Sequence, residues 1–268
     1  MKLLCDTHAH STVSDGGNTP EEMLTAAANQ GLKVFTLTDH FDIHERHPEP
    51  LSPFDGAGRE SSYKQLCRLK AANLESDTIK FLNGIEIAQA HQYKEIAENW
   101  LDTHAYDYVL ASCHVIRGHI DFYHMDYVAN PPDVLLKQYF AELIELCEWG
   151  GASKRIDSLA HLTYPLRYMK GEVDIVKNKS AIDDLFRVLI KYEIALELNT
   201  GYALLCPELS LIERYRELGG RLITIGSDAH GVDLIAQRFE AAVETAKTAG
   251  FTECVYYQDR KANFVKLS

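Results

Sequence analysis

Seven short apolar segments are spread along the chain, and segments with helical character separate them. The apolar segments are predicted as strands at residues 3–5, 33–38, 80–87, 108–112, 158–162, 194–198 and 221–225. The helical segments lie at residues 20–30, 61–74, 92–100, 131–149, 180–191, 207–218 and 234–249. Strands that alternate with helices favour a mostly parallel sheet with right-handed crossovers. The predicted fold class is therefore α/β, and the pattern alone leaves both a closed barrel and an open sheet possible.

Local signals mark several boundaries. Thr19 is expected as the N-cap of the first helix and Pro20 as its first residue, followed by acidic side chains in the first turn. Gly150 and Gly151 are predicted to end the fourth helix. A long polar loop is expected over residues 41–59, and the chain is expected to close with a short apolar tail.

Composition limits the class of protein. A chain of 268 residues that is 46% hydrophobic can form one sizeable core. No linker or low-complexity stretch divides it, so we expect a single domain over residues 1–268. The formal net charge of −12 argues against binding a nucleic-acid backbone over a wide surface. The oligomeric state stays open.

The cysteines and the N-terminus indicate a cytoplasmic protein. No Cys-x-x-Cys pair is present, so a structural zinc site made of thiolates is not expected. The first residues lack the apolar core of a signal peptide, and no apolar run is long enough to span a membrane. Scattered thiols without an export signal predict a reducing compartment. The six cysteines are Cys5, Cys67, Cys113, Cys147, Cys206 and Cys254.

Two histidines follow the first predicted strand. Residues two apart in a strand point to the same face, so His8 and His10 present adjacent imidazoles at the strand's carboxyl end. Open sites of parallel α/β folds lie at such ends. A divalent cation would bind both rings, whereas the competing interpretation is two surface histidines near a terminus.

Metal-capable side chains follow the later strands as well, except the sixth. Imidazoles and carboxylates without thiolates suit zinc, manganese or iron. This number of donors could hold two or three divalent ions. The competing interpretation is a few hydrogen-bonded core histidines together with exposed acids. The candidate ligands are His8, His10, Asp15, His40, Glu86, His114, His161, Asp228 and His230.

The order of these motifs resembles the polymerase-and-histidinol-phosphatase (PHP) superfamily over nearly the whole chain. The resemblance implies a distorted seven-stranded β/α barrel with a two- or three-metal centre and phosphoesterase activity. The matching motifs are His8-x-His10-Ser11, Thr38-Asp39-His40, Gly84-x-Glu86, His114, His161 and Gly226-Ser227-Asp228-x-His230.

The resemblance also implies how the ligands are shared. Asp15 departs from the histidine that some members have at its position, but a carboxylate can also bind a metal. Carried over by motif, the first ion would be held by His8, His10, Asp228 and bridging Glu86, the second by Glu86, His114 and His161, and the third by Asp15, His40 and His230.

Within the superfamily the chain is most similar to the histidinol-phosphate phosphatases. The loop after His40 and residues 114–127, 199–202 and 213–220 carry this closer resemblance. The implied reaction is hydrolysis of L-histidinol phosphate to L-histidinol and phosphate, a step of histidine biosynthesis, with a small phosphorylated substrate as the expected partner. The ions would activate water and neutralise the phosphoryl oxygens. Asp228 and His230 are candidates for the proton donor to the leaving alkoxide, and a metal-bound water could serve equally well.

Other residues are candidates for substrate binding. A phosphate dianion favours a guanidinium, and Arg117 and Arg167 each follow a candidate ligand by a few residues. The competing interpretation for each is a solvated surface arginine. The amine and imidazole of the substrate would need acids or aromatics, for which Asp42, His44, Glu45, Phe122 and Tyr123 are available.

Three other functions compete with this one. A PHP phosphoesterase that acts on nucleotides or DNA ends conflicts with the acidic composition. An amidohydrolase-type enzyme usually carries a metal-bridging lysine after a middle strand, and no lysine is placed there. A non-enzymatic binding module should have broken ligand motifs, whereas here all are filled.

Overall fold

Seven parallel strands form a nearly closed barrel in the computed structural model, which describes residues 5–43, 56–74, 76–169, 173–202 and 205–267. The strands are neighbours in chain order, so the predicted α/β barrel is confirmed. Between the last and first strands, the amide of Thr7 donates to the carbonyl of Ile225 at 3.2 Å. The strands are β1 (Cys5–Asp6), β2 (Val34–Leu37), β4 (Lys80–Ala88), β5 (Tyr108–Ser112), β6 (Ser158–Leu159), β7 (Ala195–Asn199) and β8 (Ile223–Gly226).

A further strand, β3 (His40–Asp42), pairs with the far end of β4. β4 is nine residues long, and its pairing with β2 ends at Asn83. The edge of β4 beyond that point takes up β3 and aligns His40 with Glu86. The predicted loop over 41–59 is therefore wrong at its start, and also at its end, since helix α2 begins at Gly56. Residues 44–55 lie outside the described part of the chain.

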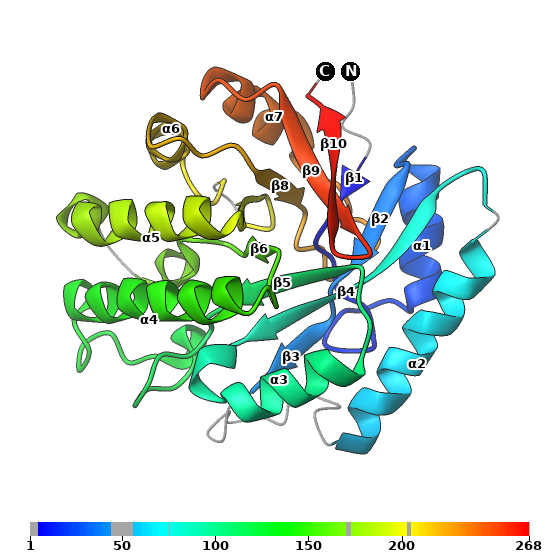
Figure 1. Ribbon diagram of the computed structural model, residues 1–268, viewed down its shortest axis with the longest axis horizontal. Helices are drawn as coiled ribbons and strands as arrows, with labels where there is room; N and C mark the ends of the chain where they lie inside the picture. The colour runs from blue at the N-terminus through cyan, green and yellow to red at the C-terminus, as the bar shows by residue number, and fades with distance from the viewer. Residues whose placement is uncertain (1–4, 44–55, 75, 170–172, 203–204, 268) are drawn as a thin grey trace.

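Helices surround the barrel on its outer side (Figure 1). The first begins as predicted: the side chain of Thr19 accepts from the amide of Glu22, and the Glu22 carboxylate accepts from the amide of Thr19. The last begins at Phe239 rather than at 234, because residues 232–238 form turns. None of the described helices has the length and apolarity that crossing a bilayer requires. They are α1 (Pro20–Asn29), α2 (Gly56–Asn73), α3 (Lys94–Thr103), α4 (Pro132–Ala152), α5 (Lys179–Tyr192), α6 (Leu209–Glu217) and α7 (Phe239–Thr248).

Helix α4 continues through Gly150 and Gly151, where the sequence predicts a stop. Both glycines allow close packing instead. A Cβ atom at Gly150 would lie 2.6 Å from the side chain of Ile156, and one at Gly151 would lie 2.5 Å from that of Tyr192. The missing side chains let α4 approach α5 and the segment that leads into β6.

The end of the chain forms an antiparallel hairpin, where the sequence predicts an apolar tail. It consists of β9 (Glu253–Gln258) and β10 (Lys261–Lys266). The hairpin lies across the barrel in Figure 1. Tyr257 stacks on Tyr108, the first residue of β5, with ring centroids 5.4 Å apart. Arg260 pairs at 2.6 Å with Asp157, which precedes β6. The hairpin therefore covers the end of the barrel at which the strands begin.

Arg260→Ala should lower the free energy of unfolding by about 1–3 kcal/mol, because it leaves a buried charged group without its partner. Burial raises the pKa of the Asp157 carboxyl, and Arg260 counteracts that rise. Without Arg260 the ionised carboxylate is the costly form. The loss should therefore be largest near pH 7 and should shrink as the pH falls and Asp157 takes up a proton. Chemical denaturation at about pH 7 and about pH 5 measures both effects.

Arg187→Ala is the matched control, because Arg187 pairs with Asp184 at 2.7 Å on an exposed helix surface. Such exposed pairs contribute about 0–1 kcal/mol. Equal losses in the two variants, or a loss at Arg260 that does not change with pH, would contradict the role given to the buried pair.

Candidate metal centre

The carboxyl ends of the barrel strands meet at a pocket of about 540 Å³. This location follows from the topology, because parallel strands all end on one side of the barrel. Three of the predicted ligands, His8, His10 and Glu86, are fully buried behind the lining. The residues that line the pocket are Asp15, His40, Asp42, His114, Asp121, Tyr123, His124, His161, Tyr164, Arg167, Tyr168, Asp228 and His230.

Glu86 lies at the centre of the group, where β4 pairs with β3. Its carboxylate is buried, with two imidazoles facing Oε1 and three, including that of His10 at 3.5 Å, facing Oε2. Oε1 lies 2.8 Å from Nε2 of His161 and 3.2 Å from Nε2 of His114. Oε2 lies 2.9 Å from Nδ1 of His40 and 3.3 Å from Nε2 of His8. One carboxylate therefore connects histidines from four separate segments of the chain.

The first set of donors joins the two ends of the chain. His8 and His10 follow β1, and Asp228 follows the neighbouring strand β8. The Nε2 atoms of the two histidines are 2.9 Å apart. Oδ1 of Asp228 lies 3.5 Å from the first Nε2 and 3.3 Å from the second. Two imidazole lone pairs repel at such a distance, so the arrangement fits a proton or a metal cation between them.

The second set contains Glu86, His114 and His161. The Nε2 atoms of the two histidines are 3.4 Å apart. Nδ1 of His114 contacts Oδ2 of Asp42 at 3.0 Å. A carboxylate on the outer nitrogen of a ligating histidine fixes the ring orientation and leaves the inner nitrogen free to bind. Asp42, predicted to bind the substrate amine, therefore orients a candidate ligand while it also lines the pocket.

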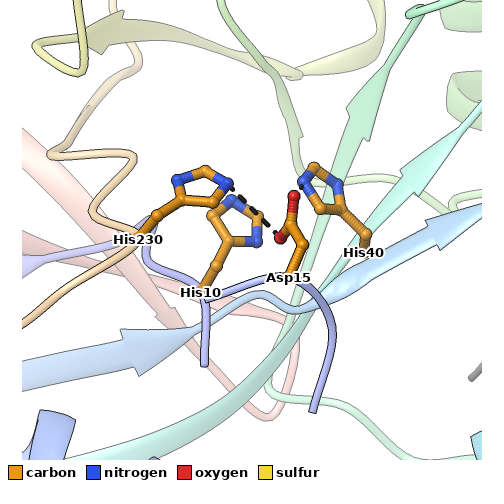
Figure 2. A group of neighbouring side chains, drawn as sticks. All are labelled: His10, Asp15, His40 and His230. Carbon is orange, nitrogen blue, oxygen red and sulfur yellow. Dashed lines mark ion pairs between the residues drawn. The ribbon is translucent and has the colours of Figure 1, made fainter. Parts of the chain in front are cut away.

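The third set lines the edge of the pocket, and Figure 2 shows its three side chains together with His10. Oδ1 of Asp15 lies 3.6 Å from Nε2 of His40 and 3.4 Å from Nε2 of His230. The ring of His10 stacks against that of His40 with centroids 4.1 Å apart, so its donors lie close to this set as well. The side chain of Asp15 is 34% exposed, whereas those of the first set are almost fully buried.

The charges of these groups depend on one another. Burial lowers the pKa of His40, but the carboxylates of Glu86 and Asp15 outweigh burial and raise that pKa to about 10. For His10, burial and the neighbouring His40 and His230 lower the pKa to about 3. The protein alone therefore holds protons on some imidazoles to balance its carboxylates. Divalent ions would replace these protons, so metal binding should weaken at low pH.

The sixth strand of the barrel, predicted to contribute no ligand, contributes a carboxylate that supports the group. Oε1 of Glu197 in β7 contacts Nδ1 of His8 at 2.6 Å. Its Oε2 accepts a hydrogen bond from the backbone amide of His161 at 2.7 Å. The next polar residue, Asn199, donates to Oδ2 of Asp228 at 3.3 Å. The available signal was an acidic residue inside an otherwise apolar strand.

Two glycines make this packing possible. A Cβ atom at Gly226 would lie 2.4 Å from Cβ of His8 and 2.5 Å from Oε1 of Glu197. A Cβ atom at Gly201 would lie 2.5 Å from Cβ of Asp228. The backbone at Asp228 itself has a φ of 52°, a conformation that non-glycine residues rarely adopt. The positions of the first donors therefore depend on close backbone approach.

Arg167 lies in the pocket, as predicted. Its Nη1 donates to Oδ2 of Asp228 at 3.0 Å and its Nη2 to Oδ1 of Asn199 at 2.9 Å. The guanidinium also lies over the rings of Tyr164 and Tyr202, at 5.4 Å and 5.2 Å from their centroids. Its side chain is 10% exposed, so the charge is held at a fixed place beside the first set.

Arg117 does not face the pocket, and its predicted position at the mouth is wrong. Its Nη1 pairs with Glu142 at 3.0 Å and with Glu145 at 2.7 Å, both on α4. The preceding residue, Ile116, is buried in the core. With Ile116 packed inwards, the Arg117 side chain points outwards to the acidic face of α4.

The remaining predicted substrate residues divide into three groups. Phe122 is fully buried and packs in the core. Tyr123 lines the pocket, together with His124, which carried no functional prediction. His44 and Glu45 lie outside the described residues.

Comparison with known proteins identifies a family and a set of relatives. The family model of the PHP domain matches residues 6–201. A probable histidinol-phosphatase of Clostridium acetobutylicum is 29% identical over 267 residues, which cover 96% of this chain and 98% of that protein. The histidinol-phosphatase of Lactococcus lactis is 27% identical over 283 residues, covering 100% and 99%. These likenesses extend over essentially the full length of both chains.

A solved structure shares the fold. The histidinol phosphate phosphatase of Lactococcus lactis, crystallised with zinc, L-histidinol and phosphate, has a TM-score of 0.80 and 24% identity to this chain. The match covers 98% of this chain and 100% of that one. The barrel with its nearly closed seven strands is therefore the fold of that enzyme.

Removal of metal with a chelator should lower the melting temperature, and addition of zinc or manganese should restore it. A ligand that binds only the folded chain stabilises it by about 2.7 kcal/mol at a free concentration of 100 times its Kd. Glu86→Gln should lose most of this gain, because Glu86 contacts both halves of the group. Melting curves and elemental analysis of the dialysed protein measure the effect.

His104→Asn is the control, because His104 stacks on Trp100, with centroids 3.7 Å apart, and is not among the pocket-lining residues. This variant should keep the metal response of the wild type. Equal metal content in Glu86→Gln and the wild type would contradict the assignment of the cluster.

Proposed function

Because this chain belongs to the PHP domain family, we propose that it is a metal-dependent phosphatase that hydrolyses L-histidinol phosphate to L-histidinol and phosphate. The full-length likeness to histidinol-phosphatases supports the substrate. The observation that carries the proposal is a single pocket that combines metal-ligand donors, a buried arginine and an acidic, aromatic wall. Such a pocket suits a phosphate ester of a cationic alcohol.

Two or three divalent ions, zinc, manganese or iron, would be held by the three sets of donors. When bound, they would neutralise charge on the phosphoryl oxygens and lower the pKa of the attacking water. The Nε2–Nε2 distances of 2.9 Å in the first set and 3.4 Å in the second support metal binding there. The sets are His8, His10 and Asp228 with Glu86; Glu86, His114 and His161; and Asp15, His40 and His230.

Arg167 would bind the phosphoryl group. Its planar guanidinium can donate to two oxygens at once, and it lies beside Asp228 in the pocket wall. Its Nε is buried without a hydrogen-bond partner in the described part of the chain. A phosphoryl oxygen would supply the acceptor that this donor lacks.

His230 is the better candidate for the proton donor to the leaving alkoxide. The surrounding groups, His8 and Arg167 foremost, outweigh burial and hold the pKa of Asp228 well below its usual range, so that carboxylate carries no proton to give. Burial lowers the pKa of His230, but Asp15 and Asp228 outweigh burial and raise it. When the third donor set holds no ion, this shift favours the protonated form of His230. Its side chain is 37% exposed at the edge of the pocket, where a departing group would pass.

The organic part of the substrate would meet a wall of carboxylate and aromatic groups. Asp121 is buried there and accepts a hydrogen bond from the hydroxyl of Tyr164 at 3.2 Å. Tyr123 and Tyr168 extend this wall, with ring centroids 5.5 Å apart. Aromatic faces and a carboxylate together attract an ammonium or imidazolium group. Asp121 thus replaces Asp42 as the candidate partner of the substrate amine.

Two further features fit a cytoplasmic, single-domain enzyme. All six cysteines are free thiols, and such thiols persist in reducing compartments. Donors from both ends of the chain share one pocket, which supports one domain over residues 1–268. We therefore propose the cytoplasm as the location.

Phosphate release from L-histidinol phosphate tests the function, with a nucleotide and an aryl phosphate measured beside it. Turnover should favour histidinol phosphate and should stop when a chelator removes the metal. Arg167→Ala should raise KM by about 10–100-fold, the loss expected for hydrogen bonds to a charged group. Arg117→Ala is the matched control, since its guanidinium pairs with Glu142 and Glu145, and KM should not change.

Preference for the nucleotide would instead support the phosphoesterase of nucleotides or DNA ends. Equal turnover of the aryl phosphate would support a metal-dependent phosphatase. It would contradict the assignment of histidinol phosphate as the specific substrate. An unchanged KM in Arg167→Ala would exclude that arginine from phosphate binding.

Asp121→Asn should raise KM for histidinol phosphate by about tenfold or more and leave KM for the aryl phosphate, which has no cationic amine, nearly unchanged. The amide keeps the shape of the side chain but removes the charge that would pair with the substrate amine. The ratio of the two KM values is the measurement. A parallel change for both substrates would indicate a general distortion of the pocket rather than recognition of a cation.

A further inference from the structure

Glu197 touches both halves of the candidate metal centre. Its carboxylate, which has no exposed surface, contacts Nδ1 of His8 at 2.6 Å with one oxygen and the backbone amide of His161 at 2.7 Å with the other. His8 belongs to the first donor set and His161 to the second. We propose that Glu197 is a positioning residue that fixes both histidines and so couples metal binding at the two sets. This inference rests on the metal-dependent function proposed above.

The contact with His8 determines which ring nitrogen faces the cluster. A carboxylate accepts hydrogen bonds, so Nδ1 carries a hydrogen towards Glu197 and Nε2 is the nitrogen that can bind an ion. That Nε2 lies 3.3 Å from Oε2 of Glu86 and 3.5 Å from Oδ1 of Asp228. These are the oxygens that would share an ion with it. Glu197 thus orients a ligand from outside the site.

The second oxygen acts on the backbone. His161 follows β6, and its Nε2 lies 2.8 Å from Oε1 of Glu86. Its Nδ1 is buried and has no hydrogen-bond partner among the described residues, so no carboxylate orients this ring from behind. The hydrogen bond from the His161 amide to Glu197 therefore fixes the backbone position from which the imidazole ring extends. Asn199 donates to the same oxygen at 3.1 Å and helps to hold it in place.

Glu197→Gln keeps the shape of the side chain and changes only the groups that orient His8 and His161. The amide has the same size, but it offers one acceptor oxygen and one NH₂ group in place of two acceptor oxygens. The amide oxygen can stay on the backbone amide of His161, but the NH₂ group then faces Nδ1 of His8, where it meets a second donor or forces the ring hydrogen onto Nε2. Loss of such a supporting carboxylate typically lowers metal affinity by about 10–100-fold. We expect this loss at the first set directly, and at the second set through the proposed coupling, because the two contacts share one rigid group.

The experiment measures zinc binding rather than turnover alone. Wild type and Glu197→Gln are freed of metal, checked for folding by circular dichroism, and titrated with zinc against a chromophoric chelator. Elemental analysis counts the ions that each protein retains. The wild type should bind its ions tightly, and the variant should bind zinc at the first and second sets about 10–100-fold more weakly.

Asp107→Asn is the matched control. Asp107 is another buried carboxylate: one oxygen accepts a hydrogen bond from the backbone amide of Asn83 at 2.9 Å, the other pairs with Lys70 at 2.8 Å, and Asp107 does not line the pocket. This variant should lose stability comparable to that of Glu197→Gln and keep the zinc affinity of the wild type. A fall in zinc affinity in both variants would mean that general destabilisation, and not positioning, weakens binding.

Unchanged zinc affinity in Glu197→Gln would overturn the inference, and weakening at only one set would overturn the coupling. If the variant does not fold, nitrogen NMR of the zinc-loaded wild type decides the tautomer. His8 should coordinate through Nε2 and carry its hydrogen on Nδ1, and coordination through Nδ1 would overturn the role of Glu197. A wild type that binds no zinc, manganese or iron would refute the metal-dependent function itself.

Discussion

The seam between β1 and β8 is the contact on which the metal-ligand group depends. There the amide of Asp228 donates to the carbonyl of His8, and the amide of His10 donates to the carbonyl of Ala229, each at 2.8 Å. Residues that carry candidate ligands make these bonds, so closing the barrel and assembling the first donor set are one event. An open sheet would leave His8 and Asp228 at opposite edges, because β1 and β8 end the strand order.

The barrel and its donor residues could be predicted because both follow local rules. Apolar segments bounded by turn residues mark the strands, and parallel strands bring whatever follows them to one end. A histidine placed directly after a strand, such as His114 after β5, therefore needs no tertiary knowledge to be assigned to the mouth. The same rule brought together donors from both ends of the chain, as far apart as His8 and Asp228.

The parts that the sequence did not predict depend on partners far away along the chain. Glu197 contacts His8, which lies 189 positions earlier in the chain, and the neighbouring sequence does not indicate that contact. Arg117 and Arg167 follow candidate ligands at similar spacing, and they differ because the first meets Glu142 on α4 and the second meets Asp228. The two arginines differ because their loops leave the barrel in different directions. Composition does not encode that direction.

The hairpin of β9 and β10 has a consequence for the order of events in the pocket. It covers the end of the barrel where the strands begin, so a substrate enters and its products leave on the other side. For a phosphate ester bound with its phosphoryl group against the buried donors, the alcohol lies nearer to the opening. Under the proposed function, the alcohol would then depart first and inorganic phosphate last. Because the other end of the barrel is closed, free phosphate would compete with the ester for the pocket. Accumulated phosphate would then inhibit turnover.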